Sequence, residues 1–219
     1  MRICSPLADV PIEELNDLIV NPFQPPRWGS DDPHQGVDFA IRSPLNQIAL
    51  AGNPIHAVLD GQVVAVMKER FPYGNAILIE TALDTLPPDL ITQLELPTPA
   101  PTLPPHPSLT CPQTGIFPIL DPGHGSLYLL YAHMQEPSAL VVGDSVICGD
   151  RLGTIGDSGN ALNPHLHLET RVGPAGAHFP SLAHYETRAK AEEMEAYCLW
   201  RVSGVFQLVN PSLIFGQLP

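Results

Sequence analysis

The sequence has no apolar run long enough to cross a bilayer, and it is short of basic residues. A spanning helix needs about 20 apolar residues, so we expect no membrane span. The opening residues also lack the apolar stretch of a secretory signal. Only 10 Lys and Arg stand against 23 Asp and Glu, a net charge of -13. Proteins that bind phosphate backbones cluster basic residues, so we expect no nucleic-acid partner and no electrostatic adhesion to anionic membranes or wall polymers.

The cysteines include no CxxC pair, which argues against a cysteine zinc site. An even count leaves room for two disulfides in three alternative pairings, and buried free thiols are the other interpretation. The four residues are Cys4, Cys111, Cys148 and Cys198. The sequence leaves their pairing open, and it leaves the oligomeric state open as well.

Proline, by contrast, is abundant. The 26 prolines among 219 residues are more than double the number expected at an average usage of about 5%. They occur in clusters, which mark loops because proline cannot donate to a sheet ladder. With 44% hydrophobic residues, the chain suits one globular domain. We therefore expect an irregular N-terminal arm over residues 1–33 and a single domain over 34–219, with insertions at about 81–124 and 174–202.

Short apolar and β-branched runs, separated by glycines, predict antiparallel strands. An Ala- and Glu-rich stretch over 187–197 predicts one C-terminal helix, and Pro11 suits the first turn of a short helix over 12–19. The expected strands cover residues 37–41, 54–58, 61–67, 75–80, 126–133, 143–150, 152–156 and 165–170, with a candidate edge strand over 204–209. The fold class expected from this pattern is mainly β.

Two histidines of the last of these main strands share one face. His165 and His167 are two residues apart, so on a strand both side chains point to the same side, while Leu166 and Leu168 point to the other. A solvated polar face alternates in the same way, but two imidazoles on such a face are unusual. The pair therefore indicates a site above an apolar underside.

A second pair of candidate ligands lies upstream. His34 and Asp38 are four residues apart with a glycine between them. Imidazole nitrogens and carboxylate oxygens both bind zinc, and a catalytic zinc has three protein ligands and one open position. His34, Asp38 and one member of the later pair would complete such a set. His133 ends an apolar strand, where a buried run emerges into a site or a loop.

These segments resemble the M23 (lysostaphin-type) peptidases. Residues 34–39 (HQGVDF) resemble the family's HxGxD segment, and residues 131–134 (YAHM) its YAH segment. Residues 156–160 (GDSGN) and 164–169 (PHLHLE) resemble its G-x-S-G and HLHxE segments. Weaker matches are residues 54–57 with 61–64, the YGN turn at 73–75, and the glycine-spaced hairpin over 143–153. The segments occur in the family's order.

The resemblance implies an antiparallel β-sheet groove of the lysostaphin-type peptidase (duplicated-hybrid-motif-like), here with a Pro-rich loop insertion and one C-terminal helix. It makes His34, Asp38 and His167 the ligands of Zn²⁺, and His133 and His165 the catalytic histidines. The implied function is a zinc endopeptidase that cuts peptidoglycan stem peptides or cross-links, secreted or in the cell envelope. Asn75 and Tyr131 could line the substrate cleft, although a turn residue and a core aromatic fit equally well.

Three alternatives remain beside this interpretation. A non-catalytic regulator of cell-wall hydrolases on the same fold is disfavoured because all five residues are present. A biotinyl or lipoyl carrier hairpin is disfavoured because no lysine lies between Lys68 and Lys190. A latent enzyme would have the N-terminal arm or the Pro-rich insertion over the zinc, with Asn21 or Asp32 at its open position. The segment before His34 departs from the family pattern.

Overall fold

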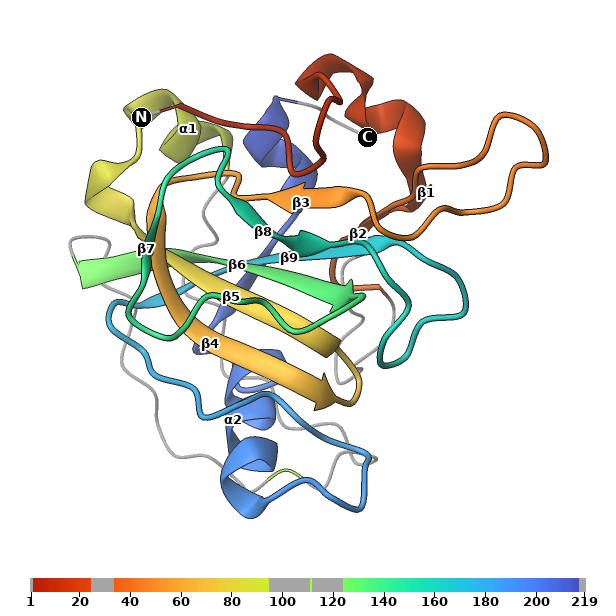
Figure 1. Cartoon of the computed structure of the whole chain (residues 1–219). Coiled ribbons are helices and arrows are strands. Elements are labelled where there is room, and N and C mark those ends of the chain that lie inside the picture. Colours follow the sequence, from red (N-terminus) through yellow and green to blue (C-terminus); the bar gives the residue numbers. More distant parts are fainter. Residues whose placement is uncertain (1, 25–33, 95–110, 112–123, 217–219) are drawn as a thin grey trace.

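The computed structural model describes residues 2–24, 34–94, 111 and 124–216 (Figure 1). These residues form a mainly β structure with a C-terminal helix, which confirms the expected fold class. The strands are β1 Ile19–Asn21, β2 Val37–Phe39, β3 Pro54–His56, β4 Gly61–Arg70, β5 Gly74–Ala82, β6 Gly125–Met134, β7 Ser145–Val146, β8 Arg151–Thr154, β9 Leu166–Pro174 and β10 Gln207–Val209.

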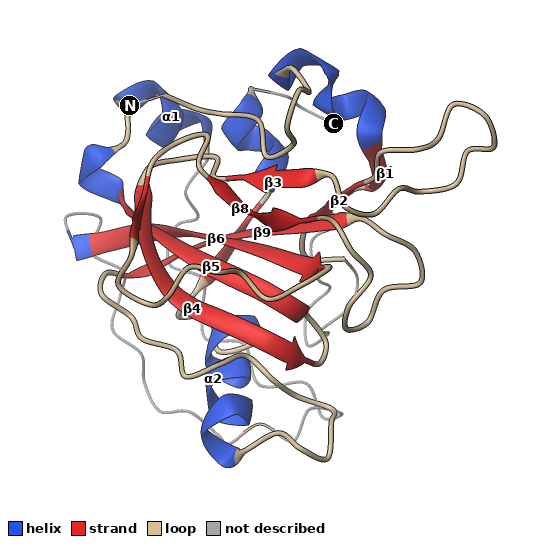
Figure 2. Cartoon of the chain, viewed as in Figure 1, coloured by secondary structure: helices blue, strands red, loops and turns tan. Residues whose placement is uncertain are grey.

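The strands form one large antiparallel sheet and one small one. The large sheet has the order β1-β2-β9-β6-β5-β4-β7, with β10 also paired to β9, and β3 pairs with β8 in the small sheet. Figure 2 shows β4, β5, β6 and β9 as the long strands at the centre. The register pairs Asp38 of β2 with His167 of β9, and His167 with Ala132 of β6. Residues far apart in the sequence therefore meet near one end of three neighbouring strands.

The large sheet is covered on both faces, so β6 is buried along its whole length. On one face, Leu127, Leu129 and Tyr131 join a cluster that includes residues of β3, β8 and the N-terminal segment. On the other face, Tyr128 and Leu130 pack in a cluster with residues of the C-terminal helix. A strand with two covered faces has no polar side, which explains the nearly continuous apolar run of this segment.

The N-terminal segment contributes to the sheet, although the sequence predicts an irregular arm here. The 3₁₀ helix η1 covers Ile12–Leu18, close to the predicted short helix, and β1 follows and pairs with β2. Leu7 and Leu15 are buried in the main core. A three-residue strand is too short to show a period of two, so the pattern could not reveal it. The prolines between residues 25 and 33 lie outside the described residues.

The C-terminal helix α2 covers Ala191–Arg201, four residues later than predicted. It begins after Lys190, whose backbone N–H donates to the Glu193 carboxylate at 2.9 Å, an N-terminal capping contact. The Pro-rich segment also contains a short helix that the sequence did not predict, α1 Pro88–Gln93, with proline in its first turn. The 3₁₀ helices η2 Leu83–Thr85 and η4 Pro211–Phe215 complete the described elements.

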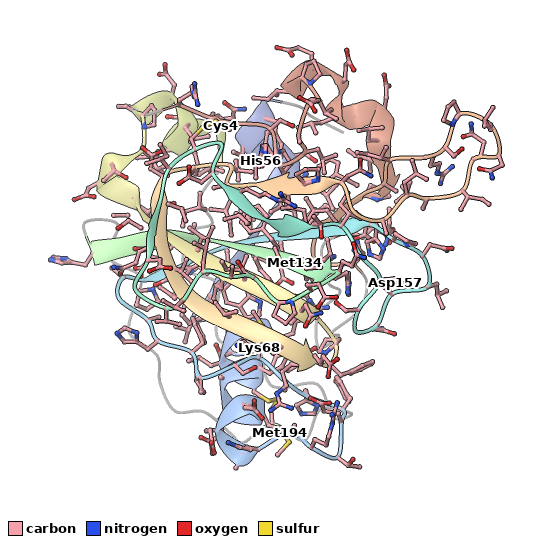
Figure 3. The ribbon with its side chains drawn as sticks, in the orientation of Figure 1. Cys4, His56, Lys68, Met134, Asp157 and Met194 are labelled. Carbon is pink, nitrogen blue, oxygen red and sulfur yellow. A yellow bond between two sulfur atoms is a disulfide. The ribbon has the colours of Figure 1, made fainter. Side chains whose placement is uncertain are left out.

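All four cysteines are in disulfides, so the alternative of free thiols was wrong. Cys4 bonds to Cys148 and Cys111 bonds to Cys198. Figure 3 labels Cys4 beside the small sheet, far from Met194 on α2, so the two bridges hold opposite sides of the molecule. Disulfides persist in oxidising compartments, and the pair is consistent with an extracytoplasmic location. Within the described ranges, no helix is both long and apolar enough to cross a bilayer.

Candidate metal centre

The site lies where β2, β9 and β6 end together. Asp38 is on β2 and His167 is opposite it on β9. His34 lies four residues before Asp38, on the chain that enters β2. Three of the predicted site residues are therefore brought together by strand register and by one short segment.

The atoms of this trio are within contact distance of one another. His34 Nε2 lies 3.0 Å from Asp38 Oδ1 and 3.1 Å from His167 Nδ1, and His167 Nδ1 lies 2.8 Å from Asp38 Oδ1. All three side chains are at least partly buried, and their donor atoms converge on one point as candidate ligands for a metal ion. Two imidazoles and one carboxylate form a donor set that zinc accepts. The residues present therefore fit this metal.

The second nitrogen of each imidazole faces an oxygen atom. His34 Nδ1 lies 3.1 Å from the carbonyl oxygen of Pro22, and His167 Nε2 lies 3.6 Å from Glu169 Oε2. Metal-binding histidines typically donate their other N–H to a carbonyl or carboxylate, which fixes the ring and its tautomer. His34 has such a contact, whereas His167 Nε2 is buried without a hydrogen-bond partner among the described residues, beyond hydrogen-bond distance of Glu169. Asn21 Nδ2 donates to Asp38 Oδ2 at 3.1 Å, so β1 supports the carboxylate as well.

Two opposing effects set the pKa values of this trio. Burial raises the pKa of Asp38, but hydrogen bonds with His167 and His34 outweigh it and hold that pKa well below its ordinary value. Burial lowers the pKa of His167, but contacts with Asp38 and Glu169 outweigh this and raise it to about 9. The pocket thus strongly favours a positive charge between these carboxylates. A bound cation would satisfy the same preference.

A buried ionic cluster lies directly below His167. Glu169 is fully buried, and it accepts hydrogen bonds from Arg171 Nε at 2.6 Å, Tyr73 OH at 2.8 Å and Arg201 Nη1 at 3.2 Å. Burial raises the pKa of Glu169, but the two guanidinium groups outweigh it and keep the pKa below its usual range. The carboxylate is therefore ionised and held in place beneath the trio.

The sequence interpretation gave this cluster no role. Glu169 follows His167 by two residues on one strand, and Arg171 follows by two more, so a period of two could have placed all three on one face. Arg171 also donates to the side chain of Gln35 and to the carbonyl of Phe206. Arg201 comes from α2, and nothing in the local sequence links that helix to β9.

His133 and His165 lie beside the trio and against each other. Their ring centroids are 4.7 Å apart, and the centroid of His133 is 5.7 Å from that of His167. His133 Nδ1 lies 2.8 Å from the carbonyl of Ser158, and His165 Nδ1 lies 2.8 Å from the carbonyl of Asn163. A carbonyl only accepts, so Nδ1 carries the hydrogen in both rings, and in a neutral ring Nε2 then has the lone pair.

The two histidines differ in their surroundings. Burial lowers the pKa of His133 to about 3, helped by the nearby imidazoles of His167 and His165. His165 is more accessible, and its Nε2 lies 3.6 Å from Asp38 Oδ1. His133 also has a positive φ of 60°, a conformation that costs backbone energy in non-glycine residues and that often occurs at functional sites. The geometry keeps His133 neutral and gives His165 an anionic neighbour.

These side chains open into a groove of about 750 Å³. One wall is the loop after β2, with Arg42, Gln47 and Ile48, and the other is the loop over residues 160–164. Tyr73 and Arg201 lie at the groove as well. In Figure 3, Asp157 marks the start of the second loop and Met134 the end of β6 beneath it. A groove of this volume has room for several residues of a peptide.

Asn75 and Tyr131 do not line this groove. Tyr131 is buried in the core, and its hydroxyl accepts the backbone N–H of Val58 at 2.9 Å. Asn75 is buried too; its amide oxygen accepts from the backbone of Glu69, and its NH₂ donates to backbone carbonyls including that of Gln135. Both side chains thus fit the structural alternative, a core aromatic and a turn residue.

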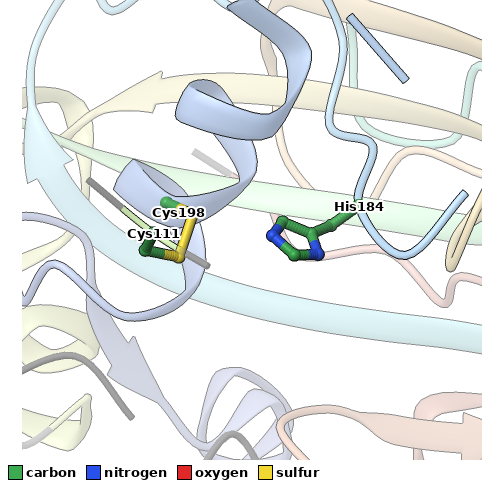
Figure 4. A group of neighbouring side chains, drawn as sticks. All are labelled: Cys111, His184 and Cys198. Atoms are coloured by element: carbon green, nitrogen blue, oxygen red, sulfur yellow. A yellow bond between two sulfur atoms is a disulfide. The ribbon is translucent and has the colours of Figure 1, made fainter. Parts of the chain in front are cut away.

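A second group of potential ligands lies on the far side of the sheet. Cys111, Cys198 and His184 have ligand atoms within 4.8 Å of one another, and Figure 4 shows the imidazole facing the sulfur pair. The two sulfurs are bonded to each other, so neither is a thiolate ligand in this state. Among the other histidines outside the predicted site, His56, His124 and His178 do not line the groove, while His106 and the candidate Asp32 lie outside the described residues.

Comparisons with known proteins agree with the motifs. Residues 113–179 match the model of peptidase family M23, which confirms the resemblance that the sequence showed. The matched stretch contains His133, His165 and His167, whereas His34 and Asp38 precede it. The match suggests a metallopeptidase, whose substrate would be a peptide. No match was found among curated proteins.

Solved structures similar to this chain include a zinc-containing peptidase from Vibrio cholerae, with 23% identity and a TM-score of 0.39. The similarity covers 69% of this chain but only 32% of that longer peptidase. The catalytic domain of lysostaphin from Staphylococcus simulans has 21% identity and a TM-score of 0.43, over 74% of this chain and 86% of that domain. The catalytic domain of the prophage-encoded M23 protein EnpA from Enterococcus faecalis, solved as a point mutant, has 22% identity and a TM-score of 0.41, over 74% of this chain and 87% of that domain.

Proposed function

We propose that this protein is a zinc-dependent endopeptidase that hydrolyses peptide bonds of bacterial peptidoglycan. The observation that carries the proposal is the convergence of His34 Nε2, Asp38 Oδ1 and His167 Nδ1 within 3.1 Å of one another, with two further imidazoles beside them. Structural zinc sites are closed by four protein ligands, whereas catalytic ones have three and an open position. A set of three at the floor of an open groove suits catalysis.

The chain's own residues would divide the work as follows. The trio would hold zinc, which when bound would supply Lewis-acid polarisation of the scissile carbonyl and activation of water. His133 is neutral near pH 7, and its Nε2 lone pair suits it to take a proton from the attacking water. His165 Nε2 lies 3.6 Å from Asp38 Oδ1 at the edge of the trio, and with a proton on this nitrogen it can support the developing oxyanion or protonate the leaving amine. Glu169 Oε2 lies 3.6 Å from His167 Nε2 and places a negative charge beside this ring.

The peptidoglycan substrate and the location are inferred from the M23 motifs. The groove's open shape supports a polymer-borne peptide rather than a small enclosed ligand, and the two disulfides suit a secreted or cell-envelope protein. We further propose that residues 34–219 act as one peptidase domain. The chain supplies its own N-terminal β1 as a support of that domain, through the contact between Asn21 and Asp38.

That same contact favours a second candidate, a latent form of the enzyme. Asn21 lines the groove and contacts the carboxylate of Asp38, so the end of β1 lies at the site and would compete with substrate for space. A non-catalytic regulator on this fold has less support, because all five predicted residues are present and converge.

Peptidoglycan digestion tests the proposal. Purified protein is incubated with intact sacculi, with and without a chelator, beside His133→Ala and the matched control His56→Ala, which lies outside the groove. New amine termini found by mass spectrometry should require both metal and His133, because general-base catalysis is worth about 10²- to 10⁴-fold. Release that persists with chelator and in His133→Ala would overturn the proposal. Absence of release from zinc-loaded protein, restored by Asn21→Ala, would identify the latent form.

A further inference from the structure

The groove is cationic in a strongly acidic protein. The chain has 23 acidic and 10 basic residues. Among the described residues that line the groove, however, the one carboxylate is Asp38, a predicted metal ligand, and the cations are Arg42 and Arg201. A bound divalent ion would add to the positive side. Charge of this sign in a cleft attracts anionic ligands over the background of the whole molecule.

Arg42 is the exposed cation of the pair. It lies on the loop directly after β2, four residues beyond Asp38, and the loop is closed by a bridge to Ala49 and by the hydrogen bond from Leu50 N to Ile41 O at 2.8 Å. The arginine is thus carried on a short hairpin anchored next to the metal trio. In the described part of the chain, no carboxylate forms an ion pair with Arg42. Its guanidinium therefore has its charge directed to the groove and solvent.

Arg201 adds positive charge from below. It contacts Glu169, but that single carboxylate also pairs with Arg171. The guanidinium of Arg201 therefore lies at the groove within an ionic cluster that it shares with Glu169 and Arg171. Because this cluster is buried, water and salt screen it less than they screen a surface pair.

Apolar side chains border the same groove. Ile48 on the hairpin and Leu162 on the opposite loop both line it and are strongly exposed, at 61% and 97%. These side chains can contact the aliphatic part of a peptide, whereas Arg42 offers a fork that matches a carboxylate.

We propose that this groove selects a peptide with a free carboxylate close to the scissile bond, and that Arg42 binds this carboxylate. The proposal rests on the proposed peptidase function and narrows its substrate. Stem peptides whose diamino acid has a free carboxylate meet this requirement. A glycine bridge, or a stem peptide amidated at that position, has no such carboxylate.

Binding to the zinc-loaded His133→Ala protein tests the proposal without turnover. The probes are a cross-linked stem peptide with its diamino-acid carboxylates free and the same peptide with those carboxylates amidated, measured by calorimetry. The free form should bind about five- to ten-fold more tightly, as expected for one accessible charge-assisted contact. Adding Arg42→Gln should remove the difference by weakening only the free form. The matched control Arg151→Gln, which removes an exposed charge outside the groove, should preserve it.

The outcomes distinguish failure of the carboxylate selectivity from failure of the peptidase function. Equal affinity for both peptides, a preference unchanged by Arg42→Gln, or binding of neither peptide would overturn the carboxylate proposal. Failure of the peptidase function itself is read from the parent protein, since zinc-loaded enzyme that cleaves neither peptide nor sacculi would contradict it. Cleavage of both peptides with the same KM would preserve the peptidase and reject the selectivity.

Discussion

His167 and His133 are buried imidazoles of one site, and their pKa values move in opposite directions. Burial lowers both, yet the pKa of His167 is raised to about 9 and that of His133 is lowered to about 3. His167 contacts the carboxylates of Asp38 and Glu169, whereas His133 donates to the neutral carbonyl of Ser158. Whether a buried imidazole here is protonated or neutral is therefore decided by the groups that it contacts and not by its burial.

Removing the charge of Asp38 should have the largest effect on the difference between His167 and His133. Asp38→Asn takes away one ligand and the anion next to His167, so zinc affinity should fall by more than about 100-fold, beyond the usual loss for an outer-shell partner. Metal per chain after dialysis against a weak chelator measures it. Asp157→Asn, at an exposed position outside the groove, serves as the control and should retain zinc.

Changing His133 should affect catalysis and leave the metal in place. His133→Gln removes the lone pair at Nε2, so kcat should fall by about 10²- to 10⁴-fold while zinc content stays that of the parent. Steady-state kinetics and metal analysis on the same sample give both values. Loss of zinc together with activity would place His133 among the ligands and refute the division proposed above.

Glu169 is the second carboxylate next to His167, and replacing it tests how far this buried charge supports the site. Glu169→Gln leaves Arg171 and Arg201 without their buried counter-charge, so the free energy of unfolding should drop by about 3–5 kcal/mol. Zinc affinity should fall by about 10- to 100-fold because the ligand His167 loses the carboxylate charge beside its Nε2. Denaturant melts of the metal-free and zinc-loaded protein measure both. Glu195→Gln on the exposed face of α2 should match the parent.

The smallest expected effect concerns acid stability. In the metal-free protein the pKa of His133 is about 3 in the folded state and near 6.5 in the unfolded state. Between these two pH values the unfolded state binds more protons than the folded state. The contribution of His133 to stability is therefore fully present above pH 6.5 and is lost as the pH falls. The loss approaches about 1.4 kcal/mol per pH unit. Denaturant melts from pH 6.5 to 5 should show this slope, and His133→Gln should be flatter by that amount.

Local patterns predicted the strands well, because apolar alternation and glycine spacing are properties of each segment. The trio His34, Asp38 and His167 was expected from motifs, and the strand register brings it together. The Glu169–Arg201 contact could not be expected, since it joins β9 to a helix about 30 residues later through tertiary packing. β1 was missed because three residues carry too little pattern.

The account depends most directly on which atoms surround the zinc. X-ray absorption of the zinc-loaded protein, beside His133→Ala, reads that shell without crystals. The account predicts nitrogen and oxygen neighbours at about 2.0–2.2 Å, two of them imidazoles, in both proteins. Sulfur at about 2.3 Å, or the loss of an imidazole in His133→Ala, would contradict it.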